Sequence, residues 1–290
     1  MAKIRVLAEN DLAGVVELFG RVYPERRWAS QQACYSYFRE ILFDNPWHAL
    51  EVPSWVAEEG GRICGVYAMM PRRMLLRGRP LRVAAACQFM VDRDRRNTLI
   101  ALQLAKACLS GPQDLTFADG ASEQVRRMWI GIGGTASLLY SLHWTRPLRP
   151  ARFLLSLAEG RGALPRLASF AALAPCNAAD ALFARLRPNR FYREAIHFQE
   201  DALDSAAMLA GLHEILRGYA LQPAYDQATL DWLLDQTARK SRHGKLRGRA
   251  VRDGERGLIG WYVYYLEASR IGEVVQLAAL EGSFDVVLRL

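Results

Sequence analysis

The stretch "FMVDRDRRNTLIALQLAKACLSG", residues 89–111, reads as a strand, a basic turn and an amphipathic helix in succession. Three arginines, Arg93, Arg95 and Arg96, lie where the strand passes into the first turn of the helix. The free amide groups and the positive end of the macrodipole at a helix N-terminus already favour an anion. The added arginines therefore indicate a phosphate-bearing ligand at this turn, and a solvated surface turn is the alternative.

The composition is that of a globular protein with acidic partners. The chain has 290 residues, of which 51% are hydrophobic and 23% charged, enough for a substantial core and for two domains. Its net charge of +8 favours nucleotides, phosphorylated cofactors or anionic lipid surfaces as partners. It has neither a run of five like charges nor the aromatic–glycine pattern of an RNA-binding sheet, which argues against nucleic acid.

The cysteines and histidines argue against disulfides and metals. Five scattered cysteines form no CxxC pair, and the five histidines show no ligand spacing such as HExxH. The sequence therefore predicts a reducing, cytoplasmic location and no metal site. No secretory signal is evident at the N-terminus, and the most apolar later segment, residues 163–186, is too interrupted by proline and polar residues to span a bilayer.

Hydrophobic periodicity predicts alternating strands and helices over the first half of the chain. Asn10 or Asp11 can cap the first helix, in which Leu12, Val15, Val16, Leu18 and Phe19 form an apolar stripe. "EEGG" at 58–61 predicts a hairpin turn, and the apolar strand at 79–91 is expected at the centre of a sheet. The expected elements are a strand at 3–8, helices at 12–23 and 30–43, a hairpin at 54–75, a strand at 79–91, a helix at 96–109, a strand at 114–120 and a helix at 122–134, capped by Ser122.

The C-terminal third repeats part of this pattern. Residues 246–290 read as three strands joined by turns, followed by the start of a helix at Ser283. We therefore expect a first domain at 1–150, a mainly helical connector at 151–200 and a partial second unit at 201–290. Because the last helix would end after about eight residues, either its partner elements come from elsewhere or the chain is truncated after Leu290.

The element order and the opening stretch together resemble the GNAT superfamily of acyl-CoA N-acyltransferases, in its double-domain form. This resemblance implies an α/β (α+β) fold, in which helices flank a mixed, mostly antiparallel sheet, with a second, incomplete GNAT-like unit. In that family an RxxGxG or RxxGxA loop after the fourth strand holds the pyrophosphate of coenzyme A on backbone amides. Here "RNTLIA" supplies Arg96 and Ala101, while Leu99 replaces the central glycine.

The resemblance implies an N-acyltransferase that uses acetyl-CoA or another acyl-CoA as co-substrate and a small-molecule or peptide amine as acceptor. The cofactor-binding residues that it implies are Phe89, Val91, Arg95, Arg96, Asn97, Thr98, Leu99, Ala101, Asp119 and Ser122. In the second unit, Glu281 and Phe284 take the places of the motif's arginine and glycine, which predicts a structural or acceptor-binding half.

No catalytic residue can be assigned from the sequence. Family enzymes often use a tyrosine four residues before a glycine as the acid, and Trp129, four residues before Gly133, cannot supply that proton. Tyr140 is either a substitute acid or a core residue, and Asp119 and Glu123 are either bases or structural carboxylates. Six aromatic residues either fill the core or line an acceptor pocket: Trp28, Tyr35, Tyr37, Phe38, Phe43 and Trp47.

Two other functions stay open. The chain could be a non-catalytic binding or scaffold protein that keeps the GNAT architecture without using the cofactor. It also resembles the Fem-type aminoacyl transferases, which pair two GNAT-like units, although their helical arm is not recognisable here. The acyl chain, the acceptor and the oligomeric state are not indicated by the sequence.

Overall fold

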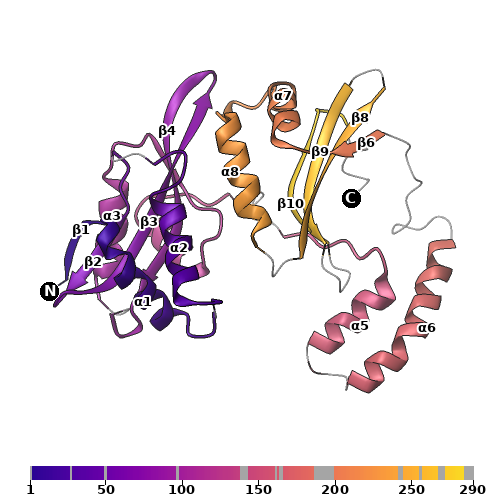
Figure 1. Cartoon of the computed structure of the whole chain (residues 1–290), viewed down its shortest axis with the longest axis horizontal. Helices are drawn as coiled ribbons and strands as arrows, with labels where there is room; N and C mark the ends of the chain where they lie inside the picture. Colours follow the sequence, from indigo (N-terminus) through magenta and orange to yellow (C-terminus); the bar gives the residue numbers. More distant parts are fainter. Residues whose placement is uncertain are drawn as a thin grey trace.

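The chain forms two β-sheets with helices around them, as seen in a computed structural model (Figure 1). The structure describes residues 2–26, 28–48, 51–95, 98–137, 143–160, 162, 166–185, 199–240, 244–254, 257–266 and 272–283. The helices are α1 (Leu12–Val22), α2 (Gln31–Leu42), α3 (Ile100–Leu109), α4 (Glu123–Gly131), α5 (Pro150–Gly160), α6 (Arg166–Arg185), α7 (Ser205–Ile215) and α8 (Gln227–Ala238). The strands are β1 (Lys3–Val6), β2 (Trp55–Glu59), β3 (Arg62–Leu76), β4 (Arg79–Val91), β5 (Leu115–Phe117), β6 (Gln199–Ala202), β7 (Leu221–Pro223), β8 (Lys245–Asp253), β9 (Gly257–Leu266) and β10 (Gly272–Ala279).

The first sheet has the order β1-β2-β3-β4-β5, and β7 pairs with β3 beyond β2. Every pairing in it is antiparallel except that of β4 with β5. The β2–β3 hairpin turns at Gly60 and Gly61, both at positive φ, as the "EEGG" sequence predicts. The predicted fold class, a mostly antiparallel sheet flanked by helices, is confirmed.

Helices cover both faces of the first sheet. The apolar stripe of α1 packs with α2 and with Val66 and Met90 of the sheet in one core. Residues of α3, including Ile100 and Leu104, pack with Tyr67 and Met69 in a second core on the opposite face. The sequence-based expectation that residues 79–91 form a central strand is therefore confirmed, because β4 lies between β3 and β5 and carries residues of both cores.

The start of the chain is tied down by an ion pair that titrates at low pH. The Arg5 guanidinium donates to both carboxylate oxygens of Asp11, at 2.6 and 2.7 Å, and its Nε donates to Glu58 at 2.7 Å. These hydrogen bonds lower the pKa of Asp11 below its ordinary value of 3.8. A carboxyl group with a lowered pKa stabilises the fold above that ordinary value, and the stabilisation is lost as the pH falls through the folded-state pKa.

We therefore expect Asp11→Asn to destabilise the protein by about 1 kcal/mol near neutral pH, since the pair is only half-buried. The difference between wild type and Asp11→Asn should shrink as the pH falls below about 4. Urea unfolding at a series of pH values measures it. A difference that stays constant down to about pH 2.5 would show that the Asp11 charge is not what stabilises this corner.

The second sheet, in the order β10-β9-β8-β6, reproduces the first four strands of the first sheet. In both sheets the hairpin is bulged shortly after its turn, which leaves Cys64 in β3 and Ile259 in β9 without a Cα partner. The next strand is also bulged at the same place in the register, at Cys87 in β4 and Val275 in β10. Cross-strand pairs of β3 and β4 therefore correspond to pairs of β9 and β10: Gly65–Val91 to Gly260–Ala279, Tyr67–Phe89 to Tyr262–Leu277, and Ala68–Gln88 to Val263–Gln276.

Helix packing repeats as well. A side chain added at Gly14 of α1 would lie 2.8 Å from Ile63, and one added at Gly211 of α7 would collide with Leu258. Ile63 and Leu258 hold equivalent positions in β3 and β9, so a helical glycine allows close packing on the middle strand in both units. The second unit thus contains the strand–helix–helix–three-strand half of the first.

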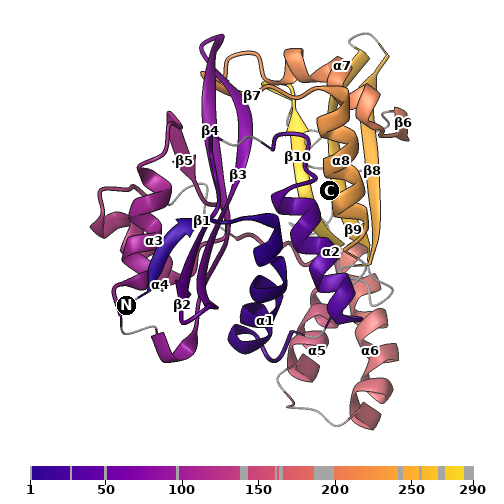
Figure 2. The ribbon, with the colours of Figure 1, turned by 60° about the vertical axis from the view of Figure 1, so that its left-hand side comes forward.

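The two units meet through their second helices, α2 and α8, which lie side by side in Figures 1 and 2. Trp232 of α8 stacks edge-on against Trp47 with ring centroids 5.4 Å apart. Gln236 of α8 and Arg239, the C-cap of that helix, both donate to the Glu40 carboxylate of α2, at 2.7 and 2.8 Å. Together with the pairing of β7 and β3, these contacts join the units across both helices and a sheet edge.

Several boundaries differ from the sequence-based expectations. The helix expected at 96–109 begins at Ile100, because the chain first makes a 3₁₀ turn at Arg93–Arg95. Residues 284–290, where the final helix is expected, lie outside the described residues. The domain boundaries at 150 and 200 stay a proposal, and two short strands cross the expected division: β6 begins at Gln199 and β7 joins the first sheet. Among the described helices, none has the length and apolarity to cross a membrane.

Candidate active site

The strands β4 and β5 pair over three residues and then part. Val83–Ala85 lie beside Leu115–Phe117 in parallel register, but β4 continues to Val91 with no strand of the described residues on that side. The bulge at Cys87 lies two residues beyond Ala85, the last residue of β4 that pairs with β5. Among the described residues, the part of β4 from Ala86 to Val91 therefore has no neighbour on this edge, which leaves an opening in the sheet next to the turn that leads into α3.

The basic turn after β4 is held by its own side chains. Asp92 is buried, and its Oδ2 accepts from Arg21 at 3.0 Å and from Arg62 at 2.9 Å. Arg93 donates to the carbonyl of Val22 at the end of α1. Arg95 forms an ion pair with Glu59 at 2.6 Å. Two of the three arginines of the turn thus hold the loop on the hairpin and on α1.

Two amides at the start of α3 have no acceptor among the described residues. Leu99, at the N-cap, is 68% exposed, so its side chain does not fill a groove. Thr98 Oγ1 accepts from the Ile100 amide at a long 3.4 Å. Within the described residues, no group accepts from the amides of Ala101 and Leu102. Arg96 and Asn97, the other predicted residues of this turn, lie outside the described part of the chain.

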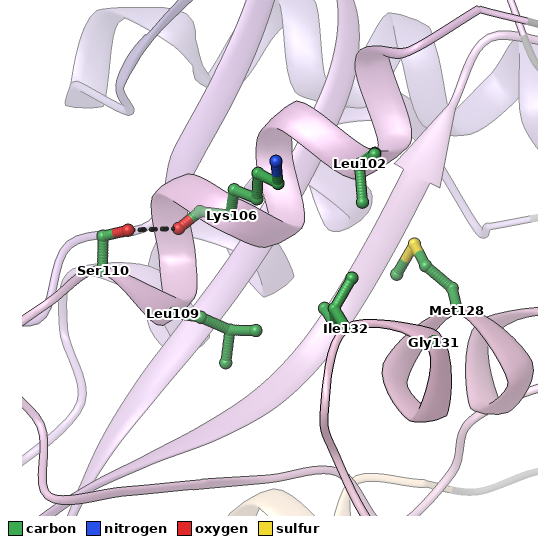
Figure 3. Close-up of a pocket in the computed structure, with 7 residues that line it drawn as sticks. All are labelled: Leu102, Lys106, Leu109, Ser110, Met128, Gly131 and Ile132. Carbon is green, nitrogen blue, oxygen red and sulfur yellow. Dashed lines mark hydrogen bonds between the residues drawn. The ribbon is translucent and has the colours of Figure 1, made fainter.

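A groove between α3 and α4 starts near these amides (Figure 3). It has a volume of about 730 Å³, and one wall is formed by Leu102, Lys106 and Leu109 of α3. Met128 and Ile132, at the end of α4, form the opposite apolar wall. The exposed Lys106 supplies a cation one turn beyond Leu102, so the groove is apolar along its sides with one positive charge midway along its α3 wall.

Trp129, at the position of the expected acid, makes a structural contact. Its indole N–H donates to the hydroxyl of Tyr67 at 2.7 Å, and Tyr67 is 2% exposed. The Tyr67 ring lies 4.4 Å from that of Phe89, centroid to centroid, and burial raises the pKa of Tyr67. Phe89 and Val91 thus face the α3 side, where their side chains pack in the core. Tyr140, the alternative acid, lies outside the described residues.

The carboxylates near the opening differ in what they can do. Glu123 pairs with Arg126 and Arg127, both at 2.8 Å, which lowers its pKa to about 2 and makes it a poor base. Asp119 is exposed and follows β5 at the edge of the opening. Ser122 caps α4 by accepting from the Val125 amide at 3.5 Å. Asp119 is therefore the described carboxylate best placed to take a proton.

The opposite face of β4 carries polar groups next to the α2 aromatics. Gln88 donates to the Tyr37 hydroxyl at 3.2 Å. The Cys87 thiol reaches solvent, but the surrounding protein raises its pKa to about 11, so it is protonated at neutral pH and not a nucleophile. Most of the six predicted aromatics do pack in or against the core, while Trp28 lies half exposed at its edge.

Comparison with known proteins supports the family suggested by the sequence. Residues 3–111 match the family described as "Acetyltransferase (GNAT) domain", which confirms the predicted GNAT resemblance over that part of the chain. A search of the curated proteins found no match. No cluster of three metal-ligating side chains occurs among the described residues, and the predicted absence of a metal stays a prediction.

Solved structures extend the likeness to the whole fold. A protein of Enterococcus faecalis V583 described as a probable N-acyltransferase is similar over 99% of this chain and 61% of its own, with a TM-score of 0.52 and 9% identity. Glucosamine-6-phosphate N-acetyltransferase from Arabidopsis thaliana matches 50% of this chain and 97% of its own, with a TM-score of 0.39 and 18% identity. A GNAT family acetyltransferase from Brucella melitensis, solved with acetyl-CoA, matches 47% and 84%, with a TM-score of 0.34 and 18% identity.

Proposed function

We propose that the protein is an N-acyltransferase that takes an acyl group from acetyl-CoA or another acyl-CoA and transfers it to an amine. The observation that carries this proposal is the pair of amides at Ala101 and Leu102, for which no described residue supplies an acceptor, next to the opening between β4 and β5 in a domain that matches the GNAT family. Converging amides at a helix N-terminus are what a pyrophosphate requires.

The residues at this end of α3 fit the cofactor in charge and shape. The amides of Ala101 and Leu102 would hold the pyrophosphate, with Lys106 as the nearest described cation on the same helix. The Leu99 side chain is exposed and is not packed into the protein. Arg95 acts by holding the turn against Glu59, and the contributions of Arg96 and Asn97 stay a prediction.

The cofactor would supply a thioester, which an amine attacks at the carbonyl carbon as the C–S bond breaks. The protein has to place the amine, take its proton and return a proton to the leaving thiolate. Asp119 is the described group at the opening that can take a proton. Trp129 cannot give one to the thiolate, so most of the acceleration is expected from holding the two reactants together.

Acetyl-CoA binding tests this function directly. At about 100 times its dissociation constant, a ligand adds roughly 2.7 kcal/mol, which is expected to raise the melting temperature by several degrees. Lys106→Ala should weaken binding about two- to fivefold, because an exposed charge contributes up to about 1 kcal/mol. Lys240→Ala, at the end of α8, is the matched control. If millimolar acetyl-CoA leaves the wild-type melting temperature unchanged, the protein does not use this cofactor.

A non-catalytic binding protein is the second candidate. It is favoured by one observation, the hydrogen bond that holds Trp129 on Tyr67 where an acid is expected. Trp129→Tyr discriminates between the two functions. In an enzyme that lacks its acid, Trp129→Tyr should raise the rate of thiol release from acetyl-CoA in the presence of amines. In a scaffold protein neither form releases thiol.

A further inference from the structure

The helices α5 and α6 form a hairpin that lies apart from both sheets (Figures 1 and 2). Asp180 of α6 joins the two helices, because its carboxylate accepts from the amides of Ala151 and Arg152 at the start of α5, at 2.8 and 3.1 Å. None of the hydrophobic cores formed by the described residues includes a residue of either helix. The packing of the two units therefore does not explain the apolar residues of this hairpin.

The helix α6 has polar residues on its buried side and apolar residues on its exposed side. Ser169 and Asp180, about three turns apart, share the buried face and are 4% and 8% exposed. Phe170 and Leu182 are 76% and 62% exposed. A surface helix normally has the reverse arrangement, with its apolar residues turned inward. The outer face of α6 therefore has the character of an interaction surface.

The residues of this outer face form a row that reads the same in both directions. Phe170, Ala174, Ala178 and Leu182 follow one another at intervals of four, and all are exposed. We call them the α6 ridge. Rows of this kind are the ridges through which helices pack, and two of them cross at about −50°. When the α6 ridge meets a copy of itself in antiparallel orientation, small alanines lie at the crossing and large side chains flank it on both sides.

Two-fold symmetry determines which residues meet. With the axis midway between Ala174 and Ala178, Phe170 of one copy lies level with Leu182 of the second copy. Arg185 follows Leu182 by nearly one turn, and a helical side chain leans toward the N-terminus of its helix. The Arg185 guanidinium can therefore reach the Phe170 ring of the second copy, a favourable position for a cation.

The position of the hairpin favours the antiparallel orientation. The end at which α5 leads into α6 lies farthest from both sheets (Figures 1 and 2). Antiparallel pairing of two α6 helices therefore places the sheets of the two copies at opposite ends of the pair. Parallel pairing would bring the sheets of both copies to the same end, where they compete for space.

We propose that the α6 ridge binds the α6 ridge of a second copy of this chain, so that the protein forms a two-fold symmetric dimer. The charge distribution favours this occupant over an anionic lipid surface. From Leu167 to Ala184 the sequence contains no lysine or arginine, and its one charged residue, Asp180, is buried. A helix that lies on an anionic membrane carries cations along its polar face. An uncharged face also lets two copies with a net charge of +8 approach each other.

The size of the ridge predicts a weak dimer. A helix of this length is about 30 Å long, and a face roughly 10 Å wide on each copy buries about 600 Å² in total. This area is below the range of about 1,200–2,000 Å² for stable complexes. We therefore expect a reversible dimer with a dissociation constant of about 10–100 µM.

Analytical ultracentrifugation of the whole chain, from about 5 to 200 µM, measures the dimer. Phe170→Glu and Leu182→Glu should each weaken it at least tenfold, because each substitution occurs twice in a symmetric dimer and brings a charge into an apolar contact. Both side chains are exposed in the single chain, so the melting temperature of the monomer should not change. Tyr219→Glu is the control, since Tyr219 is 60% exposed outside the hairpin and this variant should dimerise as wild type does.

Cysteine cross-linking tests the orientation. Ala174→Cys and Ala178→Cys are prepared separately with Cys87→Ser and Cys176→Ser, since the other native cysteines are buried. One variant carries a mass tag, so that the mixed disulfide is recognised by its size. In the antiparallel dimer residue 174 of one copy meets residue 178 of the second, so the mixture should form a disulfide faster than either variant alone.

Three results would overturn the proposal. The first is a wild-type chain that stays monomeric up to 200 µM, whether or not it binds vesicles of anionic phospholipid. The second is a dimer that Phe170→Glu and Leu182→Glu leave as tight as wild type. The third is a mixture of the two cysteine variants that forms a disulfide no faster than each variant alone.

Discussion

Gly65→Val is expected to lower the free energy of unfolding by about 3 kcal/mol and to abolish the thermal shift caused by acetyl-CoA. A Cβ atom at residue 65 would lie 2.9 Å from Leu104 Cδ1 and 3.2 Å from both Ala57 Cβ and Ile100 Cγ2. Neither the sheet nor α3 can move far enough to relieve all three contacts. The added side chain therefore displaces the first turn of α3, whose amides form the proposed pyrophosphate site.

Urea unfolding measures the loss of stability, and thermal shift with acetyl-CoA measures the loss of the site. Gly20→Ala is the matched control, because a Cβ atom there meets nothing within 4 Å and the residue lies on an exposed face of α1. It should stabilise the protein slightly, by about 0.5–1 kcal/mol. Equal effects of the two substitutions would mean that the close approach of α3 to β3 does not determine the site.

Trp47→Ala should destabilise the protein by about 3–5 kcal/mol, the range for truncating a large buried aromatic side chain. Trp47 is 5% exposed and packs in the first core, against Trp232 of the second unit and beneath the guanidinium of Arg72. Its loss opens a cavity at the junction of the units. We expect the substitution also to speed proteolysis between them.

Differential scanning calorimetry and limited proteolysis check this expectation. Trp144→Ala is the control, since Trp144 is 61% exposed and such surface changes usually stay within about 0.5 kcal/mol. A Trp47→Ala protein as stable as Trp144→Ala would show that the two units do not depend on this contact.

The order of the elements could be predicted because local patterns determine it. The stripe of α1, the Ser122 cap and the glycine turn of the β2–β3 hairpin all act over a few residues, and the structure contains each of them. The repeat was visible as two similar hairpins, but its strongest signs, the matching bulges at Cys87 and Val275, depend on strand register and cannot be read from one strand alone.

The site was harder to predict because its residues act through distant partners. Nothing in the sequence near Arg95 shows that this residue forms an ion pair with Glu59. Likewise, the indole of Trp129 in α4 donates to Tyr67, which lies in β3. Arg72 is visible in the sequence only as a charge within a largely apolar strand. Its unpaired Nη1 could be recognised only once β3, Trp47 and the second unit were in place.

Backbone amide NMR during titration with acetyl-CoA tests the cofactor site most directly, because it observes the atoms proposed to bind the pyrophosphate. The amide signals of Ala101 and Leu102 should shift most and saturate at one ligand per chain. The control is Leu280, which occupies in the second unit the position of Asp92 in the first: the Leu280 amide donates to the Ile259 carbonyl as the Asp92 amide donates to the Cys64 carbonyl. The amide signal of Leu280 should not shift. Unchanged signals at Ala101 and Leu102, or the largest shifts at Leu280, would contradict a cofactor site at the start of α3.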